Sequence, residues 1–128
     1  MIYLDSSVAL AHILAEERAP SERLWAGQVG SSRLLAYEVW NRLHVAGLGE
    51  SHAREAEALL ARVALLELGP RILERALKPF PVSVRTLDGL HLASMFFLEG
   101  AGESIELASY DKRMNAAAEA LNLKLFSL

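Results

Sequence analysis

The sequence contains no cysteine, which excludes disulfide bonds and thiolate metal sites. A reducing, cytoplasmic environment is therefore the expectation. The first residues lack a basic segment followed by an apolar stretch, so we expect no secretory signal peptide. The longest apolar stretch, residues 90–98, is too short to span a bilayer and includes His91 and Ser94, so no membrane association is expected either.

The chain also lacks an excess of positive charge. Its 13 Lys and Arg residues are outnumbered by 16 Asp and Glu residues, and the formal net charge is −3. A protein that holds a long nucleic acid through its phosphates is usually basic. However, an enzyme that concentrates acids at a metal site can be acidic overall and still bind RNA through the metal. The net charge therefore does not decide for or against a nucleic-acid partner.

What the chain does have is enough apolar residues for one core. It has 128 residues, of which 52% are hydrophobic and 23% are charged, as is typical of a compact globular protein. No repeat, linker or low-complexity segment interrupts it. We therefore expect a single domain over residues 1–128.

Short apolar runs alternate with segments of helical spacing along the chain. The expected strands are residues 2–4, 31–35, 64–68, 105–109 and 123–126. The segments between them have helical spacing. Ser51 and Thr86 are suited to cap helices there, Pro70 suits a first helical turn and Asp111 opens a helix. Strands that alternate with helices pair in parallel, with helices on both faces. The sequence thus predicts an α/β fold, a three-layer α/β/α sandwich with a mainly parallel sheet of four to five strands.

Four acids occur where the expected strands end or helices begin. Asp5 ends the first strand, and Glu38 falls in the first turn of the helix after the second strand. Asp111 follows the fourth strand, and Asp88 opens the apolar helix expected at residues 87–98. Functional groups of such sheets gather beyond the carboxyl ends of the strands. We therefore expect these acids to meet at one edge of the sheet.

Each acid alone has a simpler interpretation, because an acid at a helix start can act as a cap and Glu38 could pair with Arg42. Together the four are harder to explain. Two carboxylates 4 Å apart repel by about 4 kcal/mol at an effective dielectric of 20, so a cluster needs protons or a cation. An all-oxygen ligand set selects Mg²⁺ or Mn²⁺ rather than zinc. Such an ion can promote phosphodiester hydrolysis, which indicates a metal-dependent nuclease.

The segments around these acids resemble a known family. They are Tyr3-Leu4-Asp5-Ser6-Ser7, Ala36-Tyr37-Glu38-Val39 with Asn41-Arg42, Arg85-Thr86-Leu87-Asp88-Gly89-Leu90-His91-Leu92-Ala93, and Ala108-Ser109-Tyr110-Asp111-Lys112-Arg113. In this order they are similar to the PIN-domain nucleases, and more narrowly to VapC-type toxins of toxin–antitoxin pairs. The resemblance implies Mg²⁺-dependent endoribonuclease activity, a homodimer and inhibition by a small antitoxin protein. It also implies that Asp5, Glu38, Asp88 and Asp111 are the catalytic and metal-binding acids.

Five further residues are candidates for substrate binding. Ser6 and Ser109 match positions where the family often has a hydroxyl near the site. Arg42, Arg85 and Lys112 flank the acids and could hold RNA phosphates, although ordinary surface charge explains each of them equally well.

His91 follows Asp88 by three residues and could act as a ligand or a proton carrier. We interpret it instead as a buried, hydrogen-bonded histidine. Many family members have a further acid in the helix of Asp88, whereas residues 94–98 have none. The number of metal ions, one or two, therefore stays open.

Other functions fit a domain of this size. A receiver-like phosphoacceptor domain needs an acidic pair after its first strand and a lysine beyond its last; here serines follow Asp5, and Lys124 falls inside a strand. A PIN-fold protein could also process RNA without being a toxin, or bind RNA or protein without cutting. The complete set of acids argues against a non-cutting scaffold.

Overall fold

The computed structural model describes residues 1–128 and contains one five-stranded sheet of order β3-β2-β1-β4-β5. Every neighbouring pair is parallel. The strands are β1 (Ile2–Leu4), β2 (Val29–Ser32), β3 (Ala64–Leu66), β4 (Glu106–Ala108) and β5 (Lys124–Leu125). This confirms the predicted parallel sheet. The order also argues against the receiver-like alternative, because the doubly wound sheets of that class have the order 2-1-3-4-5.

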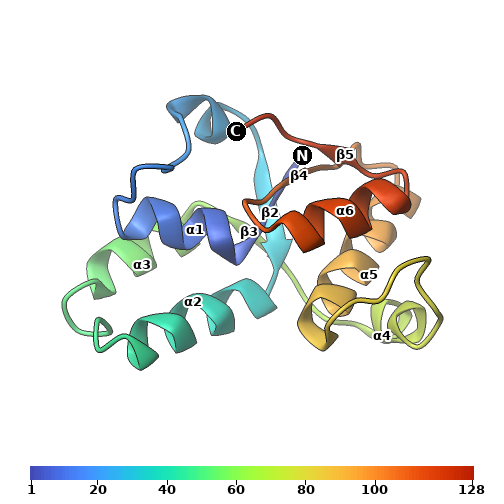
Figure 1. Cartoon of the computed structure of the whole chain (residues 1–128), viewed down its shortest axis with the longest axis horizontal. Coiled ribbons are helices and arrows are strands. Elements are labelled where there is room, and N and C mark those ends of the chain that lie inside the picture. Colours follow the sequence, from blue (N-terminus) through green and yellow to red (C-terminus); the bar gives the residue numbers. More distant parts are fainter.

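Helices cover both faces of the sheet, as predicted. They are α1 (Ser6–Ile13), the short 3₁₀ helix η1 (Glu22–Ala26), α2 (Leu34–Val45), α3 (Ala53–Ala61), α4 (Pro70–Ala76), α5 (Thr86–Gly100) and α6 (Lys112–Ala120). Figure 1 shows α1, α2 and α3 on one side of the strands, with α5 and α6 on the other and α4 beside α5. No helix combines the length and the apolar character needed to cross a bilayer.

The alternating direction of strand side chains creates two separate cores. On the central strand β1, the fully buried Leu4 packs into the core beneath α1, α2 and α3, while its neighbour Tyr3 packs into the core beneath α5 and α6. Strand β4 divides in the same way, with Ala108 in the first core and Leu107 in the second. Successive residues of a strand point to opposite faces, and this property produces the three layers.

The expected bounds of the second strand are wrong, and this matters for the site. The second strand ends at Ser32 rather than at residue 35, because the Ser32 hydroxyl accepts the N–H of Leu34 at 3.1 Å and α2 begins there. Glu38 therefore lies in the second turn of α2, not the first. The expected caps Ser51 and Thr86 also fail, since α3 and α5 begin without a side-chain cap.

Candidate active site

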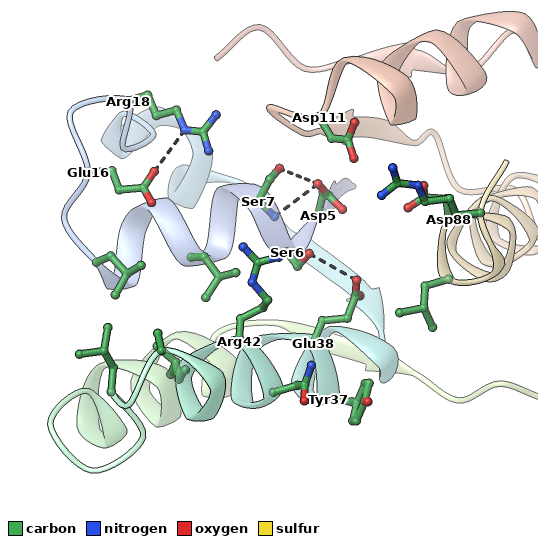
Figure 2. Close-up of a pocket in the computed structure, with 18 of the residues that line it drawn as sticks. Asp5, Ser6, Ser7, Glu16, Arg18, Tyr37, Glu38, Arg42, Asp88 and Asp111 are labelled. Atoms are coloured by element: carbon green, nitrogen blue, oxygen red, sulfur yellow. Dashed lines mark hydrogen bonds and ion pairs between the residues drawn. The ribbon is translucent and has the colours of Figure 1, made fainter.

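The four predicted acids line one pocket of about 720 Å³ beyond the carboxyl ends of the central strands. They reach it from the N-terminal ends of α1, α5 and α6 and from the second turn of α2. Figure 2 shows the carboxylates of Asp5, Glu38, Asp88 and Asp111 directed towards one region between these helices. The structure thus brings together side chains that lie far apart in the sequence.

Asp5 is the most firmly held of the four. Its Oδ2 atom accepts hydrogen bonds from the Ser7 N–H at 3.3 Å, the Ser7 hydroxyl at 2.5 Å and the Ser109 hydroxyl at 2.8 Å. The Ser7 N–H bond caps α1, so the cap interpretation is correct for this residue. The other oxygen, Oδ1, accepts no hydrogen bond from the protein. Asp5 can therefore cap its helix and still offer one oxygen to a ligand.

Asp111 combines the same two roles at the start of α6. Its Oδ1 atom accepts the backbone N–H groups of Arg113 at 2.9 Å and Met114 at 3.4 Å. Its own N–H donates to the Ser109 hydroxyl at 2.9 Å. Its Oδ2 atom has no partner in the protein. As at Asp5, the helix cap fixes one oxygen and leaves the second free.

Glu38 is held by side chains instead of by a helix end. Its Oε1 atom is hydrogen-bonded to Nε2 of His91, and its Oε2 atom accepts the Ser6 hydroxyl at 3.4 Å. The alternative pairing with Arg42 does not occur, because the side-chain partners of Glu38 are His91 and Ser6. His91 itself is 1% exposed, which confirms its interpretation as a buried, hydrogen-bonded residue.

Asp88 experiences the combined charge of the site. Partial burial, followed by the negative charges of Asp111 and Asp5, raises the pKa of Asp88 above its ordinary value. Its carboxylate makes no hydrogen bond to the protein in the structure. An acid without donors, facing other acids, is the arrangement that a bound cation would relieve.

The four acids line one pocket, but they do not approach one another as closely as the sequence predicted. No group of three or more Asp, Glu or His side chains is close enough to hold a metal ion together as the structure stands. The chemistry of the donors nevertheless suits Mg²⁺ or Mn²⁺, because all four are carboxylates and Asp5, Asp88 and Asp111 each have an uncommitted oxygen. Ligation of one ion by three of them requires side-chain rotations that bring these oxygens together.

The predicted substrate residues divide into two groups. Ser6, Arg42 and Arg85 line the pocket, and Ser109 reaches Asp5 from within the fold. Lys112 is exposed and does not line the pocket, so the structure does not bring it to the acids. Adjacency to Asp111 in the sequence therefore did not predict the position of Lys112, which is the first residue of α6.

Sequence reasoning missed one cation of the pocket, Arg18. It lies in the loop after α1, forms a 3.1 Å ion pair with Glu16 and places its guanidinium 4.9 Å from the centre of the Tyr110 ring. Figure 2 shows this pair at the pocket wall opposite Asp88. No spacing in the sequence could have located it, because its position depends on how the loop folds back.

Comparisons with known proteins agree with this fold. The PIN domain family matches residues 2–120. The ribonuclease VapC46 of Mycobacterium tuberculosis is 32% identical to this chain over 130 aligned positions, which cover 98% of this chain and 96% of VapC46. The crystal structure of M. tuberculosis VapC20, a toxin that cleaves the sarcin–ricin loop, superposes with a TM-score of 0.68 at 19% identity, covering 91% of this chain and 95% of VapC20.

Proposed function

The chain belongs to the PIN-domain family, and we propose that it is a VapC-type endoribonuclease that hydrolyses RNA phosphodiester bonds with Mg²⁺ or Mn²⁺. The observation that supports this most directly is the pocket shared by Asp5, Glu38, Asp88 and Asp111. The similarity to the ribonuclease VapC46 along nearly the whole chain supports the substrate class.

The roles proposed for the acids follow from their contacts. Asp5 and Asp111 each present one oxygen that their helix caps leave free, and Asp88 presents a carboxylate without other partners. Together with Glu38 they would hold the ion. When bound, the ion supplies Lewis acidity towards a phosphate oxygen and lowers the pKa of a water molecule. Arg42 and Arg85 line the same pocket and would bind phosphates of the RNA.

We further propose a toxin role, with a small antitoxin protein and a second copy of this chain as partners. The support is the similarity to the VapC proteins. Exposed apolar side chains offer surface for such contacts: Leu73 on α4, Leu77 directly after α4, and Phe97 on α5, the helix packed beside α4. Because its substrate would be RNA and the chain has no cysteine, the cytoplasm is the proposed site of action.

The test compares RNA cleavage by the wild type with that by two isosteric variants. Purified protein is incubated with a structured RNA in Mg²⁺, in Mn²⁺ and after chelation of both. Asp5→Asn keeps the size of the side chain but removes its charge, and the matched control is Glu57→Gln at an exposed position of α3. We expect metal-dependent cleavage by the wild type and Glu57→Gln, and a loss of at least about 100-fold in Asp5→Asn. Equal cleavage by all three proteins would contradict the proposal.

A non-cutting RNA-binding scaffold is the remaining alternative. Calorimetric titration with Mn²⁺ separates the two, because a scaffold without a working site should show no metal binding that depends on the acids. Binding by the wild type that is absent in Asp5→Asn supports the nuclease.

A further inference from the structure

We propose that His91 is a positioning residue for Glu38, and that Tyr3 selects the tautomer of His91 that performs this role. This inference rests on the proposed nuclease function and adds two residues to its site. The residues form a chain of hydrogen bonds that runs from the backbone of β2 through the second core to the carboxylate in the pocket.

The three side chains come from three different elements. Tyr3 on β1 is 0% exposed, and its hydroxyl lies 2.8 Å from Nδ1 of His91 on α5. The two rings meet edge to face, with centroids 5.7 Å apart and planes inclined at 82°. The other ring nitrogen of His91, Nε2, is hydrogen-bonded to Oε1 of Glu38 on α2. The imidazole therefore bridges the sheet and the pocket.

The hydrogen atoms available to Tyr3 and His91 determine which group donates in each of these hydrogen bonds. The Tyr3 oxygen accepts the N–H of Ser32 at 3.1 Å and lies 2.8 Å from Nδ1 of His91. The nearby hydroxyls of Ser31 and Ser94 donate their hydrogens to the carbonyls of Leu4 and Leu90, each at 2.8 Å. A tyrosine phenol carries its hydrogen at neutral pH, and we assign this hydrogen to the bond with Nδ1 of His91. With Nδ1 acting as the acceptor, the ring hydrogen is on Nε2, where it is donated to Glu38.

The position of Glu38 explains why such an anchor is needed. Asp5 and Asp111 are fixed by the helix ends that they cap. Glu38 lies in the second turn of α2 and cannot cap it, and its longer side chain loses more rotamer freedom when it is held in one place. The Nε2–H group of His91 replaces the helix end as the donor that orients this carboxylate.

The same contacts argue against His91 as a metal ligand or proton carrier. Both ring nitrogens are occupied by protein groups, and His91 is not among the residues that line the pocket. A ligand needs a free nitrogen lone pair that faces the ion. His91 thus acts on the reaction only through Glu38.

The first test reads the tautomer directly and needs neither metal nor RNA. Long-range ¹H–¹⁵N NMR spectra of the metal-free protein distinguish a protonated Nε2 from a protonated Nδ1. We expect the Nε2–H form in the wild type and a mixture of both forms in Tyr3→Phe, where the donor to Nδ1 is lost. An Nδ1–H form in the wild type would overturn the proposed role of Tyr3, whatever the outcome of the nuclease assay.

The second test measures Mn²⁺ affinity by calorimetry in three variants. His91→Leu removes the donor, whereas His91→Gln places an amide N–H near the position of Nε2. Met95→Ala is the matched control, because this side chain is equally buried on α5 and makes no hydrogen bond to Glu38. We expect Mn²⁺ binding to weaken about 10–100-fold in His91→Leu, to recover in part in His91→Gln and to stay unchanged in Met95→Ala.

The outcomes separate this inference from the function on which it rests. If the wild type binds Mn²⁺ and cleaves RNA but His91→Leu does both equally well, the positioning role is overturned and the nuclease stands. If Met95→Ala loses as much affinity as His91→Leu, the effect is one of general destabilisation and the positioning role is again overturned. If the wild type neither binds Mn²⁺ nor cleaves RNA, the proposed function fails, and the role of His91 fails with it.

Discussion

The hydroxyl of Ser109 donates a hydrogen bond to Oδ2 of Asp5 at 2.8 Å, across a separation of 104 residues in the sequence. The hydroxyl oxygen of Ser109 also accepts the backbone N–H of Asp111 at 2.9 Å. Because β1 and β4 are parallel neighbours, their carboxyl ends meet, and one serine at the end of β4 can contact both acids. Ser109 therefore fixes Asp5 relative to Asp111.

Replacement of this serine should weaken the site without removing an acid. In Ser109→Ala, Asp5 keeps its helix cap but loses the donor from β4, so its free oxygen is less well directed. We expect a fall of about 10-fold to 100-fold in Mn²⁺ affinity and in RNA cleavage, less than that in Asp5→Asn. Calorimetry and the cleavage assay measure this. The control is Ser104→Ala, an exposed hydroxyl at the opposite end of β4, which should behave as the wild type.

The sequence predicted the layers and the set of acids because both depend on local patterns. Alternating strands and helices imply a parallel sheet, and a residue at the end of such a strand, like Asp5, has its position fixed by the topology. The start of α2 was placed too late because the Ser32 hydroxyl takes the N–H of Leu34, a contact with no periodic signal.

The contacts that orient the acids could not be predicted in the same way. His91 and Glu38 are 53 residues apart, and His91 and Tyr3 are 88 residues apart. Their hydrogen bonds exist only once α5 and α2 have packed on the sheet. Lys112 likewise lies outside the pocket although its neighbour Asp111 lines it. This difference depends on the direction of α6, which the sequence around Asp111 does not indicate.

Neutralising Asp88 should stabilise the metal-free protein while removing metal binding. Its carboxylate faces the charges of Asp111 and Asp5 without a hydrogen-bond donor, so Asp88→Asn relieves repulsion. We expect the free energy of unfolding of the metal-free protein to rise by about 0.5–2 kcal/mol, as for other stabilising changes at functional sites. Thermal unfolding with and without Mn²⁺ measures this. Mn²⁺ should raise the Tm of the wild type and leave that of Asp88→Asn unchanged, whereas a lower Tm in the metal-free variant would contradict the expectation.

Asp88 should also make the free energy of unfolding of the metal-free protein depend on pH. Burial and the neighbouring acids raise the pKa of Asp88 in the folded state above its ordinary value of 3.8. At pH values between 3.8 and the raised pKa, Asp88 binds more protons in the folded state than in the unfolded state. The contribution of Asp88 to stability therefore decreases as the pH rises through this range. Urea unfolding at a series of pH values should show the decrease in the wild type. The difference between wild type and Asp88→Asn isolates it, and a difference that does not vary with pH would refute this assignment.

The arginines of the pocket should contribute to RNA affinity through charge, and Lys112 should not. Arg42 and Arg85 line the pocket, whereas Lys112 is exposed outside it. In an Asp5→Asn background, which prevents cleavage, Arg42→Ala and Arg85→Ala should each weaken RNA binding. They should also lower the slope of log affinity against log salt by about 0.7–1, the value for one lost phosphate contact. Lys112→Ala has the same change in net charge and serves as the control. If its slope falls as much as those of the arginine variants, the attraction comes from overall charge and not from contacts within the pocket.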